Sequence, residues 1–331
     1  MSTPLSSTAQ QALLATSRWK VWEPALWVLA FFAPLVVPGH ALFISEIAVV
    51  ALFAISLDLI LGYTGIVSLG HAAFFGVGAY AAALFAKLVM PDPLVGLAVA
   101  CLASTTLGAG CSLTIMRGSD LTRLMVTLGV GLILLELANK LDWLTGGADG
   151  LQGVMIGPVL GQFAFDLSGR TAAYYALSVC LVLFFVLRRL VHSPFGGTLT
   201  AIRDNRLRAM AIGVPVTSRL AVVYTIAAGV AGIAGGLLAQ TTGFASLDLF
   251  AFERSADLML MLVIGGTGWL WGGIVGAIVF KLMHNVISAI TPQYWTFWIG
   301  LFLVVLVLVG REKLLKPWTW FIKSSKIGNH E

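Results

Sequence analysis

The sequence is short of charged residues. Only 11% of its 331 residues are Asp, Glu, Lys or Arg, whereas soluble domains carry about a quarter. Apolar residues make up 59% of the chain, and its mean hydropathy is +0.95. Unbroken apolar runs of about 20 residues recur, which is the length that crosses a bilayer as a helix. Membrane β-barrels instead alternate apolar and polar residues. We therefore predict an all-α, polytopic membrane protein.

Motifs of nucleotide and metal chemistry are missing as well. No Gly-x-x-x-x-Gly-Lys-Ser/Thr phosphate loop occurs, so we expect no ATP hydrolysis of the P-loop kind in this chain. The three cysteines form no redox pair or zinc spacing and lie in apolar runs: Cys101, Cys111 and Cys180. We expect no metal or other cofactor in this chain, and no nucleic-acid partner despite its net charge of +5.

An intramembrane enzyme would need a nucleophile with a base, or metal ligands on facing helices. His71, His192 and His284 do not have a metal-binding spacing. An ion-coupled secondary transporter would carry carboxylates in the middle of its spans, and few are found there. We therefore expect a transport subunit without enzyme activity, and we keep the secondary transporter as the weaker alternative.

The apolar runs define one transmembrane domain over residues 22–311. The polar segments 1–21 and 312–331 are predicted to be cytoplasmic tails, since the first lacks the apolar core of a signal peptide. We expect about 8–10 spans, with one window either crossing twice or forming a re-entrant hairpin. The windows are 22–38, 43–61, 64–89, 94–116, 121–141, 171–191, 218–240, 256–290 and 294–311.

Charge between the spans predicts the orientation, because cytoplasmic connections are rich in Lys and Arg. If the N-terminus is placed in the cytoplasm and the spans alternate, the inner connections carry these basic residues: Arg117, Arg123, Arg188, Arg189, Arg203, Arg206, Arg208, Arg219, Arg311, Lys313, Lys316, Lys323 and Lys326. The outer connections carry mostly acids: Asp142, Asp149, Asp166, Arg170, Asp248, Glu253, Arg254 and Asp257. The prediction places 192–218 in the cytoplasm and 142–170 outside.

The stretch GYTGIVSLGHAAFFGVGAYAAAL, residues 62–84, is a poor continuous helix. Each helix-interior Gly costs about 1 kcal/mol relative to Ala, and unwound backbone persists in a membrane only where protein or a wet cavity satisfies it. Two interpretations stay open, close helix packing and a translocation path. Gly76 and Gly78 favour packing. The candidates for the path are Gly62, Tyr63, Thr64, Gly65, Ser68 and His71.

A second break follows about 200 residues later in VIGGTGWLWGGIVGA. We predict that Gly265, Gly266, Thr267 and Gly268 also belong to the path. Asp58 and His71 are ionisable at membrane depth, so each is a candidate for substrate contact. The alternatives are a solvated Asp58 near the inner interface and a neutral His71 bonded to backbone.

Residues 193–216, SPFGGTLTAIRDNRLRAMAIGVPV, are basic and amphipathic within an apolar chain. Pro194 suits a first helical turn, and Gly213 followed by Pro215 is typical of a helix end. We predict a two-helix elbow that docks in a groove of a partner rather than lying on lipid. Arg203 and Arg206 would pair with the partner's carboxylates, while Ala209 and Gly213 would let it approach closely.

These motifs, together with LTGGADGLQGV at 144–154, resemble the permease subunits of branched-chain amino-acid ABC importers, especially the LivM-like branch. The chain departs from that pattern at Arg206 and Arg208, where relatives often carry acids. The resemblance implies a bacterial inner-membrane protein with both termini cytoplasmic. It also implies a second homologous permease, a periplasmic substrate-binding protein, and two cytoplasmic subunits that bind ATP and Mg. Urea or a short amide is the alternative substrate of this superfamily.

Overall fold

The computed structural model describes residues 22–309 apart from 117, 119 and 167. Within these residues the chain is helical and contains no β-strand, with two isolated bridges, Leu151–Ala245 and Val159–Phe163. The α-helices are α2 (Trp22–Val36), α3 (Ala41–Thr64), α4 (Ala72–Leu88), α5 (Pro93–Ile115), α6 (Asp120–Lys140), α7 (Asp142–Thr145), α8 (Arg170–Val191), α9 (Pro194–Asp204), α10 (Arg206–Ala211), α11 (Val216–Thr242), α12 (Phe252–Gly265), α13 (Leu270–Ile290) and α14 (Trp295–Val309). Short 3₁₀ turns are η1 (Pro38–His40), η2 (Gly147–Asp149) and η3 (Leu247–Phe250).

Six of these helices are long and apolar enough to cross a membrane: α3, α5, α6, α8, α11 and α13. The shorter apolar helices α2 and α4 accompany them. The predicted polytopic helical membrane protein is therefore confirmed. The predicted tails 1–21 and 312–331, and the basic residues assigned to the C-terminal one, lie outside the described residues.

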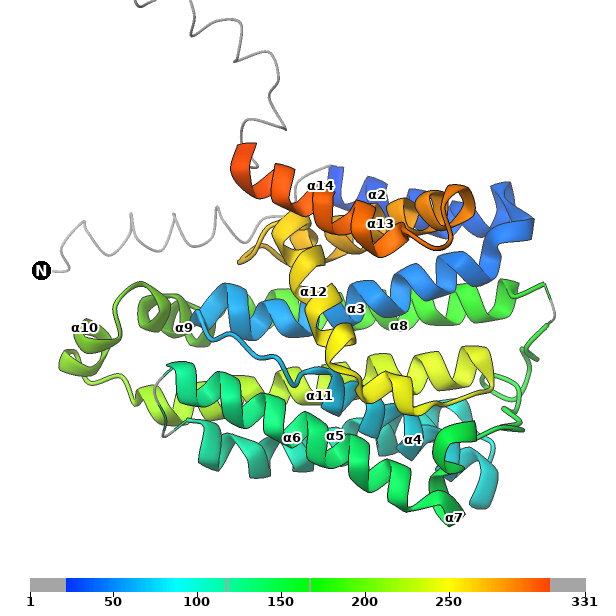
Figure 1. Cartoon of the computed structure of the whole chain (residues 1–331), viewed down its shortest axis with the longest axis horizontal. Helices are drawn as coiled ribbons and strands as arrows, with labels where there is room; N and C mark the ends of the chain where they lie inside the picture. Colours follow the sequence, from blue (N-terminus) through cyan, green and yellow to red (C-terminus); the bar gives the residue numbers. More distant parts are fainter. Residues whose placement is uncertain (1–21, 117, 119, 167, 310–331) are drawn as a thin grey trace, which may run out of the picture.

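Helices α3 and α11 form the centre of the bundle (Figure 1). In each, 72% of the most apolar stretch is buried inside the protein, against 28% in α5 and 22% in α6 and α13. A helix that is apolar all round belongs in such a position. The peripheral helices expose large apolar side chains instead, as expected of helices that face lipid.

Glycine allows α4 to lie directly against α11. A Cβ on Gly78 would be 2.1 Å from the carbonyl oxygen of Gly232, and one on Gly235 would be 1.9 Å from that of Phe75. Small residues let membrane helices approach this closely. Gly76 faces the ring of Phe250, 2.6 Å from a built Cβ. The packing interpretation of Gly76 and Gly78 is confirmed.

The two ends of the bundle differ. The elbow end carries α9 and α10, at the left of Figure 1, and the loop end carries α7 and the segment 146–169, at the right. Helix α3 runs from the loop end to the elbow end. At the elbow end the buried Arg188 of α8 forms an ion pair with the buried Glu23 of α2. The last turn of α8 therefore fixes the start of α2 beside the elbow.

Two predicted windows are interrupted. Window 64–89 contains a non-helical segment before α4 begins at Ala72, and window 256–290 divides into α12 and α13. Both interruptions were expected from their glycines. Helix α12 is only 14 residues long, and in Figure 1 it runs obliquely across the long helices instead of parallel to them.

Candidate functional site

The elbow is the pair α9 and α10, residues 194–211, closed by Gly213. Pro194 occupies the first turn of α9, and Asn205 separates the two helices. The Asn205 side chain accepts a hydrogen bond from the Arg208 N–H at 2.8 Å, which caps α10. Gly213 has φ of 87°, a conformation that Gly adopts without strain. The predicted two-helix elbow and its closing glycine are confirmed.

The elbow has one face on the bundle and one away from it. Leu199, Ile202 and Ala209 are buried against the chain's own core, with Ala209 only 2% exposed. The small size of Ala209 thus serves packing within the chain, and the partner contact expected at this residue stays a prediction. Gly213 meets no atom within 4 Å of a built Cβ, so it does face open space.

Two apolar residues on the outer face were missed by the sequence reasoning. Leu207 is 76% exposed and Ile212 is 72% exposed, beside Met210 at 46%. Exposed apolar side chains of this kind indicate a surface that contacts a partner or lipid. The signal was available in the sequence, since Leu207 lies between two arginines and Ile212 directly precedes the closing Gly213 in the basic segment RLRAMAIG.

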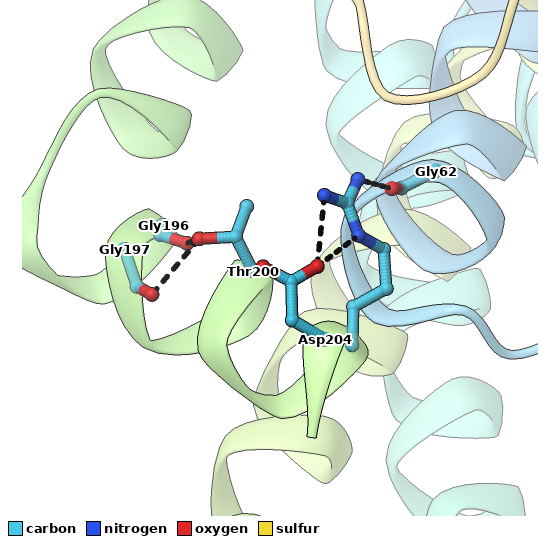
Figure 2. Close-up of polar contacts among 6 residues, drawn as sticks. Gly62, Gly196, Gly197, Thr200 and Asp204 are labelled. Atoms are coloured by element: carbon cyan, nitrogen blue, oxygen red, sulfur yellow. Dashed lines mark hydrogen bonds and ion pairs between the residues drawn. The ribbon is translucent and has the colours of Figure 1, made fainter. Parts of the chain in front are cut away.

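Arg203 of α9 reaches the end of α3, where its partner Gly62 is labelled in Figure 2. Its Nη1 donates to the carbonyl oxygen of Gly62 at 2.8 Å, while Nε and Nη2 each lie 3.1 Å from Oδ1 of Asp204. The prediction gave this guanidinium to a partner's carboxylate. In the structure it binds within the chain, to Gly62 in the last turn of α3, just before the first break. The second predicted contact, Arg206, is half-buried in the first turn of α10.

The first break begins where α3 ends. Gly65 takes φ of 75° and donates its N–H to the Leu61 carbonyl at 3.0 Å, which closes the helix. The Thr64 hydroxyl donates to the Ile60 carbonyl, and Tyr63 is buried. Residues 65–71 then run back along the bundle, as the thin blue segment between α3 and α4 shows in Figure 1.

Side chains from three helices hold the segment 65–71. His71 Nε2 lies 2.8 Å from the hydroxyl of Ser56, whose own proton goes to the Phe53 carbonyl. The Leu69 N–H donates to Thr127 of α6, and the Ala72 N–H donates to Ser255 of α12 at 2.9 Å. Buried hydroxyls thus satisfy the N–H of Leu69 in the non-helical segment and the first N–H of α4, as a membrane interior requires.

Ser56, Thr127 and Ser255 were not singled out from the sequence, because a lone hydroxyl in an apolar span more often bonds to its own preceding turn. His71 is completely buried. Its ring bonds a side chain rather than backbone, and it is closed off from any substrate in this conformation. Ser68 is also completely buried, whereas Gly65 is exposed.

The second break is a tight turn between α12 and α13. Gly266 and Gly268 have φ of 97° and 75°. A Cβ on Gly265 would be 1.8 Å from the Gly272 carbonyl oxygen, so α12 and α13 meet backbone to backbone. Thr267 is exposed at the tip of the turn. Trp22 of α2 packs on Trp271 with ring centroids 5.2 Å apart, which anchors the turn to the first helix.

The end of α3, the second break and the elbow meet at one point, which we call the latch: Asp58, Gly62, Arg203 and Gly268. Oδ1 of the fully buried Asp58 accepts the Gly268 N–H at 2.8 Å. One turn along α3, Gly62 accepts from Arg203. A Cβ on Gly62 would be 2.1 Å from Asp58 Oδ1 and 2.2 Å from Gly268 N. Position 62 therefore leaves no room for a side chain.

The latch revises the interpretation of Asp58. The carboxylate is neither solvated nor placed to touch a substrate in this conformation, because it bonds the second break. Sequence spacing alone does not bring residues 58, 203 and 268 together. Among the residues the structure describes, no group of three His, Cys, Asp or Glu side chains could hold a metal ion.

Helix number, broken helices and the elbow define a polytopic membrane protein of the transporter type. The family model described as "Branched-chain amino acid transport system / permease component" matches residues 41–309. The chain belongs to this family.

Individual relatives agree with the family. The chain is 27% identical over 329 residues to the high-affinity branched-chain amino acid transport system permease protein LivM of Salmonella typhimurium, covering 92% of this chain and 76% of the relative. The LivM protein of Escherichia coli gives the same values. The ribose import permease protein RbsC of Bacillus subtilis is 27% identical over 172 residues, covering 46% of this chain and 51% of the relative. No solved structure matches.

Proposed function

We propose that this chain is the transmembrane permease subunit of an ABC importer for branched-chain amino acids. A separate binding protein delivers the substrate at the loop end, and two separate ATPase subunits, which bind ATP and Mg, drive transport from the elbow end. A second homologous permease completes the translocation path. The elbow is the observation that supports this proposal most directly. Its outer face exposes Leu207 and Ile212, while its Arg203 donates a hydrogen bond to Gly62 of the latch.

The chain's own geometry suggests how the ATPases act. A rigid movement of the elbow displaces Arg203, which holds the Gly62 carbonyl at the end of α3. Asp58 on the same helix holds Gly268 in the turn between α12 and α13. The elbow is thus hydrogen-bonded to the last turn of α3, just before the first break, and α3 is in turn hydrogen-bonded to the second break. Both breaks are non-helical backbone, which changes shape more easily than a continuous helix.

The relatives favour amino acids over sugars. The LivM proteins match over 92% of this chain, whereas the ribose permease matches over 46%. Urea and short amides are the alternative substrates, and neither carries the paired charges of a zwitterion. Uptake assays with urea, a short amide and leucine distinguish them.

The elbow proposal is tested by its exposed apolar face. Leu207→Asp and Ile212→Asp should each abolish copurification of the ATPase subunits with the chain, because burying an unpaired carboxylate in an apolar groove is costly. Ser218→Asp is the matched control, since Ser218 is exposed in the first turn of α11, where a negative charge suits a helix N-terminus. Full copurification with both elbow variants would reject the elbow as the docking element.

Topology gives a second test. We expect the elbow in the cytoplasm and the loop 142–170 outside. Single cysteines at Ala148 and Asn205, in a background without Cys101, Cys111 and Cys180, should react with an impermeant maleimide from opposite sides of the membrane. Labelling of Asn205→Cys in intact cells would reverse the orientation.

A further inference from the structure

A cavity of about 600 Å³ lies apart from the latch, among α3, α4, α11, η3, α12, α13 and α14. Ligand sites in proteins typically enclose about 300–1,000 Å³. Its contacts on α3 are Glu46, Val50 and Phe53, which lie on one face of the half nearer the loop end. The cavity therefore occupies the side from which the proposed binding protein delivers substrate.

The cavity carries both signs of charge, although it lies among apolar helices. Lys281 of α13 forms an ion pair with Glu46 of α3, and Arg254 of α12 forms one with Asp248 of η3 at 2.6 Å. Asp257, half-buried on α12, also lines the cavity. Ionisable residues within a membrane helix bundle are costly and usually mark a substrate or ion pathway.

The inner wall is aromatic. The rings of Phe53 and Phe75 stack with centroids 4.2 Å apart, and both line the cavity. On its other side Phe53 stacks on His71, 5.8 Å between centroids, in the segment 65–71. Leu258 and Met261 add further apolar surface. Phe53 therefore lies between Phe75 of the cavity wall and His71 at the end of the unwound segment.

Building on the proposed function, we propose that this cavity is a substrate subsite of the permease itself, for a zwitterionic α-amino acid with an apolar side chain. Asp257, assisted by Glu46, receives the ammonium group, and Lys281 with Arg254 receives the carboxylate. The side chain lies on Phe53 and Phe75, which must separate before the substrate passes. A zwitterion in an apolar surrounding requires both partners at once, and the cavity offers both within one space.

A second, larger cavity lacks the charges that a zwitterion needs, which favours the first cavity as the subsite. It encloses about 800 Å³ between α5 and α8, and none of its lining residues is charged. Leu94, Val179 and Val182 are typical of its wall. That space suits hydrocarbon and offers nothing to balance an ammonium or a carboxylate.

The direct test is photo-crosslinking in the complete transporter, with its binding protein and ATPase subunits, in nanodiscs. The probe is a diazirine analogue of leucine, delivered on the binding protein. We expect crosslinked peptides from α12 and α4 containing Met261 or Phe75, suppressed by excess leucine and unaffected by ribose or urea. Crosslinks confined to other parts of the chain would overturn the subsite.

Variants give an independent measurement. Asp257→Asn leaves both described ion pairs in place and should lower the maximal leucine uptake, at saturating loaded binding protein, at least ten-fold. Lys281→Gln should do the same, and Lys281→Arg should retain most of the rate because it keeps the charge. Glu136→Gln, on the exposed surface of α6 and outside the cavity, is the control and should match the unaltered chain.

The two proposals fail separately. If the unaltered complex moves no amino acid, the proposed function is wrong. If it moves leucine, while Asp257→Asn and Lys281→Gln keep the full rate and the crosslinks lie elsewhere, the importer stands and the subsite is wrong.

Discussion

Replacing Asp58 with Ala is expected to uncouple ATP hydrolysis from uptake, lowering leucine transport by roughly ten- to a hundred-fold while the complex still assembles. The lost interaction is a hydrogen bond from the Gly268 N–H to a carboxylate with no solvent exposure. Hydrogen bonds to charged groups contribute about 1.5–3 kcal/mol, and each 1.4 kcal/mol corresponds to about a factor of ten. Without it, α3 and the α12–α13 turn no longer move together.

The measurement is leucine uptake per ATP hydrolysed in proteoliposomes. Asp58→Asn keeps an oxygen that accepts the Gly268 N–H but removes the charge, so its coupling should fall between those of Asp58→Ala and the unaltered chain. Gly62→Ala should reproduce the Asp58→Ala defect, because its Cβ would intrude between Asp58 and Gly268.

Glu136→Gln is the control for removing a helix carboxylate. Glu136 pairs with Lys140 at 3.7 Å on the exposed surface of α6, and exposed pairs of this kind contribute little. We expect uptake and coupling close to those of the unaltered chain. Normal coupling in both Asp58→Ala and Gly62→Ala would show that the latch does not transmit the movement.

Local features of this fold could be predicted from the sequence, because they depend on nearby residues. Apolar length predicted the spans, and glycine clusters predicted both breaks. Pro194, Gly213 and Pro215 predicted the extent of the elbow. Each of these signals concerns the conformation of backbone within a few residues of its source.

Long-range partners could not be predicted in the same way. Arg203 was assigned to a partner protein, because a sequence shows an exposed basic segment but not that one of its side chains reaches Gly62, 141 residues away. Ala209 was assigned outward because a small residue suits close approach on either face of a helix. The cavity depends on Glu46 meeting Lys281, 235 residues away. Both residues lie near the ends of apolar spans, and their charges alone do not show that Glu46 pairs with Lys281.

Gly78→Ala is expected to destabilise the fold strongly, whereas the same substitution at Gly110 is expected to be neutral or stabilising. In a helix interior Ala is favoured over Gly by about 1 kcal/mol. At Gly110, on α5, a built Cβ meets nothing within 4 Å, so this preference should act alone. At Gly78 the Cβ would be 2.1 Å from the Gly232 oxygen and 2.4 Å from its Cα. The pair thus isolates packing from propensity.

The contact at Gly78 is with backbone, so no side-chain rotation can relieve it and α4 must move away from α11. Overpacking of this kind typically costs about 1–3 kcal/mol, and occasionally more. The cost is expected at the upper end here, because α11 is a central helix of the bundle and also carries Gly235 against the Phe75 carbonyl. Thermal unfolding of the purified chain in detergent is the measurement, with Tm expected to fall by roughly 5–10 °C for Gly78→Ala. An unchanged Tm would mean that α4 and α11 are not in backbone contact.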